Sequence, residues 1–182
     1  MTDAPVTAGL AHRGLAFLVD YLVIAAWLLL LVGVAIGLRS IAPDVTDAVF
    51  GDPLTAEATG FAVLTLPVIL YFAILEAAPR GATLGKRRLG IRVLTRAGHP
   101  VSRLRALART ILKLLPWELT HAIIWRFAIE GSVSEALLDA GLVIVWVLIG
   151  ANIVAALVDP ERRTLYDRLS GTRVATDSRF PA

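Results

Sequence analysis

The stretch His12–Leu38, HRGLAFLVDYLVIAAWLLLLVGVAIGL, decides the fold of this chain. Its apolar run from Gly14 to Leu38 is longer than the roughly 20 residues that a helix needs to cross a bilayer. It is also longer than the roughly 7–15 apolar residues of a cleavable signal peptide, so we expect a helix that stays in the membrane. Asp20 nevertheless lies inside this run, and Arg13 stands just before it. Charged side chains in membrane helices face protein or water, so both residues are candidates for a functional site.

The composition agrees with a membrane protein, since 57% of the 182 residues are hydrophobic. Ordinary globular domains are about 45–50% apolar. Cys is absent, which excludes disulfides and thiolate metal sites. The three histidines lack metal-ligand spacing, and no nucleophile can be matched with a base. We therefore expect no metal, no cofactor and no enzymatic activity. The basic residues lie beside apolar segments, where anionic lipid is a nearer partner than nucleic acid.

Apolar segments recur along the chain, and we predict four transmembrane helices over 14–38, 58–78, 110–129 and 137–158. The segment 110–129 has the weakest signal, because it carries Pro116 and several polar side chains: Lys113, Glu118, His121 and Arg126. It is either an interfacial amphipathic helix or a span whose polar residues face protein.

Charge placement predicts the orientation of the helices. The segment between the second and third spans is rich in bases and contains no acid, so the positive-inside rule places it in the cytoplasm. The loop after the first span is acidic, and we place it outside together with Glu130, Glu135 and Asp139. The C-terminal tail is again basic. An even number of crossings must therefore separate it from the basic segment, so the segment 110–129 either supplies a crossing or is re-entrant. We expect four spans with both termini in the cytoplasm.

The parts that do not span are short. GIRVLTRAGHPVS over 90–102 alternates apolar and polar residues and ends in a Gly-His-Pro turn, which predicts a strand and a turn. Ser102 is a candidate N-cap for a basic amphipathic helix that begins near Arg103. We expect a single domain over 8–176, with flexible ends over 1–7 and 177–182.

Two stretches match each other without a gap: PRGATLGKRRLGIRVLTR over 79–96 and PERRTLYDRLSGTRVATD over 160–177. Each follows an apolar span, which favours two parallel helical-hairpin repeats around an axis along the membrane normal. The alternative is chance similarity in an Arg/Leu-rich sequence. If the repeat is real, the two Gly-x-Arg-Val strands pair beneath the membrane. Lys86 stands where the second repeat has Asp167, so we expect an ion pair between them.

The partner of Asp20 is the central question about a site. Arg13 is about two helical turns away, too far for a tight bond. We therefore expect Asp20 to meet a base from another element, namely Arg109, Lys113 or the run 86–88. The contact is either a structural ion pair that fixes helix packing or part of a path for an ion or a proton.

Three further features are candidates. Glu76 lies near the cytoplasmic end of the second span and is placed to line a polar path. Asp167 has bases on both sides, so it is either a site residue or one half of a solvated, interfacial salt bridge. Gly33 and Gly37 form a GxxxG motif in an apolar helix, which predicts close packing with another helix, within or between chains.

Three motifs that occur in order resemble the RDD membrane-domain family, over roughly 12–174. They are HRGLAFLVDYLVI, GATLGKRRLGIRVLTRAGHPVSRLRALARTIL and RRTLYDRLSGTRV. The resemblance implies that the namesake arginine and two aspartates of the family map onto Arg13, Asp20 and Asp167. It also implies a bacterial inner-membrane protein, and a transport role has been proposed for the family.

These features leave two main functions open. One is a small ion or solute transporter, oligomeric, with Asp20 as the titrating or cation-pairing group. The other is a non-transporting membrane subunit that docks a partner, a second copy or another membrane protein, through its basic cytoplasmic face. A sensor of anionic lipid using the same face is a third option. The candidates for a functional ion pair or a transport path are Arg13, Asp20, Glu76, Lys86, Arg109 and Asp167.

Overall fold

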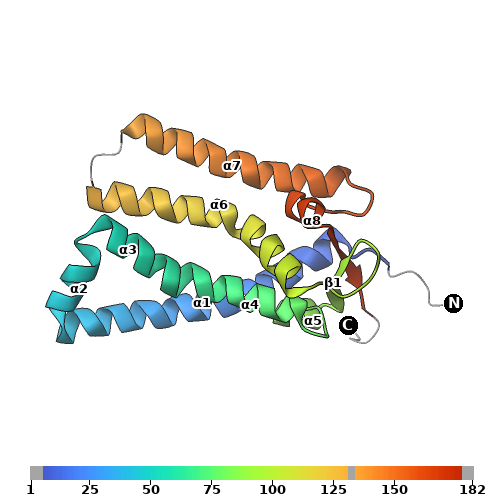
Figure 1. Ribbon diagram of the computed structural model, residues 1–182, viewed down its shortest axis with the longest axis horizontal. Helices are drawn as coiled ribbons and strands as arrows, with labels where there is room; N and C mark the ends of the chain where they lie inside the picture. Colours follow the sequence, from blue (N-terminus) through green and yellow to red (C-terminus); the bar gives the residue numbers. More distant parts are fainter. Residues whose placement is uncertain (1–5, 131–133, 178–182) are drawn as a thin grey trace. The chain divides into compact units, whose positions relative to one another are not determined.

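A computed structural model describes residues 6–130 and 134–177. In chain order the elements are α1 (Leu10–Ile41), α2 (Pro43–Phe50), α3 (Pro53–Gly60), the π-helix η1 (Phe61–Thr65), α4 (Leu66–Ala77), α5 (Leu84–Arg88), β1 (Ile91–Thr95), α6 (Arg103–Glu130), α7 (Glu135–Val158), α8 (Leu165–Leu169) and β2 (Thr172–Thr176) (Figure 1). The predicted flexible ends over 1–5 and 178–182, and the side chain of Glu130, lie outside the described residues.

Among the described residues, three helical segments are long and apolar enough to cross a membrane: Leu10–Ile41, Pro53–Ala77 and Glu135–Val158. They correspond to the predicted first, second and fourth spans. The second begins earlier than predicted because polar residues start the helix ahead of the apolar run. Asp52 caps it by accepting the N–H of Thr55 at 2.8 Å, and Pro53 supplies a backbone angle suited to the first helical position.

The predicted third span over 110–129 belongs to α6. This helix is continuous over Arg103–Glu130 and passes through Pro116, so the basic helix and the weak span are one element rather than two. It begins as predicted, because the hydroxyl of Ser102 accepts the N–H of Arg105 at 3.3 Å. In the part of the chain that the structure covers, α6 is not among the helices apolar enough to span. Its crossing therefore stays a prediction.

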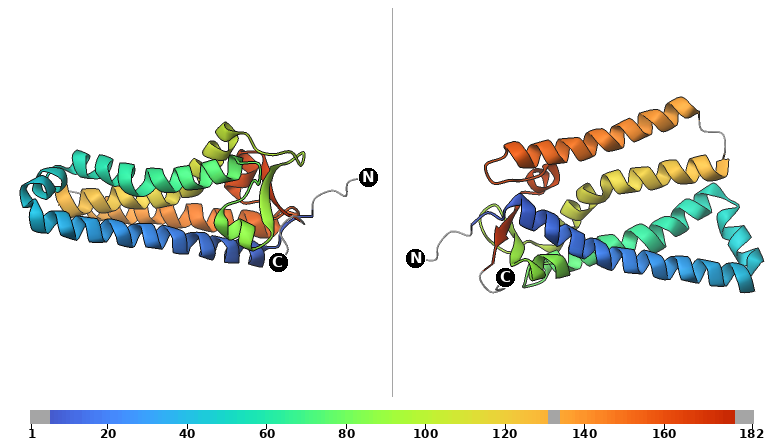
Figure 2. Two further views of the ribbon diagram at one scale, coloured as in Figure 1. Left: turned by 90° about the horizontal axis from the view of Figure 1, so that it is seen from below. Right: turned by 180° about the vertical axis from the view of Figure 1, so that it is seen from behind.

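The two short strands pair as predicted. β1 and β2 are antiparallel, with Val93 opposite Val174 and Ile91 opposite Thr176. The chain before α1 adds to the same sheet, since the N–H of Thr176 donates to the carbonyl of Val6 at 2.8 Å. Figure 2 shows this N-terminal segment beside β2. Residues 6 and 7 are thus held by β2, although we predicted a flexible end over 1–7.

The two matching stretches fold alike. α5 begins at 84 and α8 at 165, while β1 begins at 91 and β2 at 172, so each element recurs after 81 residues. Thr83 and Thr164 are the N-caps of the two short helices, and each accepts a backbone N–H with its hydroxyl. Gly90 and Gly171 have φ of 62° and 64°, a region that favours glycine. The shared sequence therefore encodes the same cap, helix, turn and strand.

The chain divides into two compact units. The first contains Met1–Val23, Ile69–Lys113 and Gly150–Ala182, and the second contains Ile24–Val68 and Leu114–Ile149. In the first unit, α5, α8 and the paired strands lie together at the ends of α4 and α7 (Figure 1). Its core includes Ala16 of α1 packed with Ile91 and Val174. All six charged candidates belong to the first unit.

Candidate functional site

Asp20 lies on α1 and is only 1% exposed. Its Oδ1 accepts the hydroxyl of Tyr71 at 2.7 Å and the backbone N–H of Gly85 at 2.8 Å, and its Oδ2 accepts the hydroxyl of Thr83 at 2.6 Å. Within residues 6–130 and 134–177, no base forms a hydrogen bond or ion pair with this carboxylate. The predicted pairing with Arg109, Lys113 or the run 86–88 is wrong. Instead, Thr83 and Gly85, at the start of α5, together with Tyr71 donate neutral hydrogen bonds to its oxygens.

Gly85 makes that contact possible. A Cβ at this position would overlap the carbonyl oxygen of Ala16 and lie 2.9 Å from the carboxyl carbon of Asp20. The backbone of α5 therefore approaches α1 more closely than any side chain would allow. This close approach explains why the second glycine of the stretch GATLGK is needed. It brings the Gly85 N–H within hydrogen-bonding distance of the carboxylate.

A second set of charges surrounds Arg109. Its Nη1 donates to Oε2 of Glu76 at 2.6 Å, while its Nε and Nη2 donate to Oδ1 of Asp167 at 3.1 and 2.9 Å. Lys86 donates to Oε1 of Glu76 at 2.7 Å, and Arg13 donates to Oδ2 of Asp167 at 2.5 Å. We refer to Lys86, Glu76, Arg109, Asp167 and Arg13 as the buried charge chain. Three bases alternate with two acids along it.

Lys86 and Asp167 do not pair directly, contrary to the sequence-based expectation. Lys86 bonds Glu76, Asp167 bonds Arg109 and Arg13, and Arg109 of α6 connects the two acids. The physical reason is that the long guanidinium of Arg109 reaches both acids, whereas Lys86 ends on Glu76 of α4.

Asp167 is buried rather than part of a solvated salt bridge. Its side chain is fully inaccessible, and it also closes a capping box with Thr164, whose hydroxyl donates to Oδ2 at 2.8 Å. Burial by itself raises the pKa of Asp167, but the charges of Arg109 and then Arg13 outweigh it, so the pKa lies well below its usual range. Asp167 is therefore ionised throughout the physiological pH range.

Lys113 lies one helical turn beyond Arg109. Its ammonium lies 3.3 Å from the ring centroid of Phe72 and 5.3 Å from that of Phe17. The faces of the two rings attract the cation. The carboxylates of Glu76 and Asp20 also act on its charge, without an ion pair to either in the described structure. This residue, which we expected as a partner of Asp20, is thus held by aromatic side chains.

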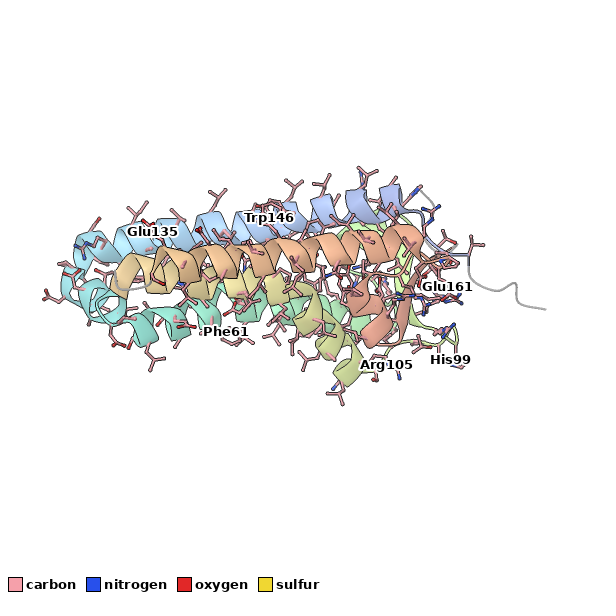
Figure 3. All side chains as sticks on the ribbon, turned by 90° about the horizontal axis from the view of Figure 1, so that it is seen from above. Phe61, His99, Arg105, Glu135, Trp146 and Glu161 are labelled. Atoms are coloured by element: carbon pink, nitrogen blue, oxygen red, sulfur yellow. The ribbon has the colours of Figure 1, made fainter. Side chains whose placement is uncertain are left out.

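The loop between α7 and α8 carries a separate ionic cluster. Glu161, which Figure 3 labels, lies 3.1 Å from Arg163 and 3.6 Å from Arg173. Asp159 accepts Arg163 at 3.0 Å and contacts Arg168 at 3.1 Å. These pairs fix the loop that leads into Thr164 and so support the position of Asp167.

Other arginines near these elements are exposed. We call this set the basic face; it consists of Arg80, Arg88, Arg103 and Arg105. Over the ranges that the structure describes, none of them has an acidic partner. Their charges are therefore open to solvent.

Gly33 and Gly37 are exposed on α1. A Cβ at either position would meet nothing within 4 Å. Within the described part of this chain the GxxxG motif is therefore not covered by another helix. Packing against a second chain stays a prediction.

The hydroxyl donors to Asp20 and Asp167 were not predicted from the sequence. The identity of Thr83 and Thr164 in the two matching stretches is the signal that could have found them, because both residues are N-caps. Tyr71 had a weaker signal, a single hydroxyl inside the second apolar run. The number of residues between Asp20 and Tyr71 gives neither the direction of the Tyr71 side chain nor its distance from Asp20.

The RDD family model matches residues 7–171. The chain belongs to the RDD family. It is 28% identical over 167 residues to the uncharacterized protein YckC of Bacillus subtilis (strain 168), with 92% of this chain and 83% of that protein covered. No solved structure matches the chain. Of the three residues suggested by the resemblance, Asp20 and Asp167 are buried in this RDD protein, and the side chain of Arg13 is 10% exposed. Arg13 and Asp167 bond each other, while Asp20 has a separate set of donors.

Proposed function

We propose that this RDD protein is a multi-pass protein of the bacterial inner membrane and works as a non-catalytic subunit. In this proposal its basic face docks an acidic partner in the cytoplasm. The observation that supports this proposal is the difference between the buried and the exposed charges of the first unit. Buried carboxylates and cations satisfy one another, whereas the arginines of the basic face are exposed and have no acidic partner in the described structure.

We further propose that α6 is the fourth crossing and that both termini are cytoplasmic. Three crossings alone would put the basic segment before α6 and the basic tail after α7 on opposite sides of the membrane. The positive-inside rule disfavours that arrangement. The length of α6, 28 residues, is sufficient for a span.

The two halves then form parallel hairpin repeats, and the strand pairing supports this part of the proposal. Exchanging the repeats moves the pair Ile91–Thr176 onto the pair Thr172–Thr95 and leaves Val93 opposite Val174. A twofold axis through the centre of the sheet would produce this register.

The contacts of the signature residues favour a structural role for them. A carboxylate that carries an ion must release one partner and take another. All the acids around Arg109 are held by two cations each, and Asp20 is held by three donors. Removing one partner would leave an uncompensated charge in a buried site, which costs about 3–5 kcal/mol. These residues thus serve to hold the cytoplasmic elements against the helices.

Affinity purification of the full chain from native membranes tests the docking proposal. The wild type should carry a stoichiometric acidic protein, and changing all four arginines of the basic face to Gln should remove it. A matched control changes Arg96 and Arg168, which are exposed but already contact Glu161 and Asp159. The control should keep the partner. A wild-type chain that purifies alone, or as copies of itself only, contradicts the proposal.

A further inference from the structure

The second unit contains a polar contact at the middle of its apolar helix. Thr65 stands twelve residues from each end of the helical segment Pro53–Ala77 and is 1% exposed. At the usual helical rise this is about 18 Å from either end. The hydroxyl of Thr65 donates to Oε2 of Glu118 on α6 at 2.5 Å. Glu118 therefore lies at the level of the midpoint of this apolar helical segment.

The helix is irregular at this level. Residues 61–65, beginning at Phe61 (labelled in Figure 3), form the π-helix η1. The carbonyl of Val63 accepts the indole N–H of Trp27 at 3.0 Å, a bond that an ordinary helix interior does not offer. Single π-helical turns inside α-helices occur frequently at functional sites.

The imidazole of His121 lies beside Glu118. Nδ1 of His121 is 3.9 Å from Oε2 of Glu118, and the His121 ring packs edge-on against Trp117. The side chains of Glu118 and His121 are 31% and 21% exposed, unlike the sealed acids of the first unit. η1 contributes Thr65 but no titratable group. Among the described side chains of the second unit, no lysine or arginine forms an ion pair with Glu118.

Among the described side chains, Glu118 is thus a carboxylate without a cation, and such a group is costly at the centre of a membrane. Insertion scales place a charged acid there at about 2.5–3.5 kcal/mol. A purely structural contact with Thr65 would be supplied equally well by a glutamine. The acid, a neighbouring imidazole and residual access together match the pattern of intramembrane proton-handling groups.

We propose that Glu118 binds and releases a proton at the centre of the membrane. Thr65 orients the carboxyl group by donating to one oxygen. The proton sits on a carboxyl oxygen of Glu118 and passes to Nδ1 of His121 when the two groups close to hydrogen-bonding distance. This site is separate from the basic face, so it stands or fails independently of the docking proposal.

Chemical labelling of the wild-type chain in vesicles tests the site without a substitution. An apolar carbodiimide reacts with protonated carboxyl groups that it can reach from the membrane. Mass spectrometry should find the adduct on Glu118, and its yield should fall as the pH is raised. Asp20, Glu76 and Asp167 should stay unlabelled because cations or donors occupy them. Absence of an adduct on Glu118, or a yield that does not change with pH, would overturn the proposal.

Infrared difference spectra across a pH step give a second measurement. The absorption of a protonated carboxyl group should appear in the wild type, be lost in Glu118→Gln and be retained in the matched control Glu135→Gln. Glutamine keeps an acceptor for Thr65, so the helices should stay packed. Thr65→Val should shift the frequency of the band, and His121→Asn should shift the pH at which it appears. A spectrum unchanged in Glu118→Gln rejects the site.

Discussion

Replacing Arg109 by Met tests whether the buried charge chain holds the first unit together. The guanidinium is 2% exposed and donates three hydrogen bonds, one to Glu76 and two to Asp167. Methionine replaces the apolar part of the arginine side chain, so the expected loss of stability comes mainly from the missing charge and its hydrogen bonds. Removing one member of a buried ion pair costs about 3–5 kcal/mol. Each acid keeps a second cation, Lys86 or Arg13, so we expect a loss within that range and not twice as large.

Thermal unfolding in detergent micelles measures the effect. For a chain of this size a loss of 1 kcal/mol lowers the midpoint by about 2–4 °C, so Arg109→Met should unfold about 6–20 °C lower than the wild type. The control is Arg105→Met on the same helix, an exposed side chain without an acidic partner in the described structure, which should change stability by less than about 0.5 kcal/mol.

A triple variant tests whether the remaining cations depend on the two acids. Adding Glu76→Gln and Asp167→Asn to Arg109→Met leaves Lys86 and Arg13 without their carboxylates. The triple variant should therefore be less stable than Arg109→Met alone, because a buried charge without a partner is costly. A single variant as stable as the Arg105 control would refute the proposed role of the charge chain.

Three further outcomes follow from the same contacts. Gly85→Ala should lower the yield of folded protein, because a Cβ would overlap the Ala16 carbonyl; a melting curve equal to that of the wild type would contradict this. Asp20→Asn should cost about 1–3 kcal/mol through weakened hydrogen bonds, measured by the same melting assay. If Asp20→Asn abolishes ion flux in proteoliposomes without any change in melting, Asp20 carries ions and is not a structural group. The lowered pKa of Asp167 means that the unfolded chain binds its proton more readily, so stability is fully present above about pH 4 and falls as acid approaches the folded pKa. Asp167→Asn should remove part of this acid dependence in a pH series of melting curves.

Local features of this protein follow from the sequence because they depend on neighbouring residues. The apolar runs predict three of the observed long helices, Ser102 predicts the start of α6, and the alternation over 90–102 predicts β1. The match between the two stretches predicts that β1 and β2 pair. Each of these predictions uses residues within one turn, one strand or one repeated pattern.

The partners of the charged residues are long-range, and this is where prediction from the sequence failed. Asp20 and Tyr71 are 51 residues apart, Arg109 and Asp167 are 58 apart, and Arg13 and Asp167 are 154 apart. Charge pairing by sign alone suggested a base for Asp20. The structure instead supplies hydroxyl and backbone donors, because the glycine at 85 lets α5 reach α1.

The sequence by itself therefore determined the three apolar helices, the N-cap of α6, the repeated stretch with its paired strands, and the family. Hydrophobic length and local hydrogen bonding encode these features directly. The tertiary structure alone decided that Asp20 meets neutral donors, that Arg109 joins Glu76 to Asp167, and that Thr65 meets Glu118 halfway along an apolar helix. The physical reason is that a buried carboxylate takes whichever donors the folded backbone brings within about 3 Å. Which donors these are depends on how closely the helices approach one another.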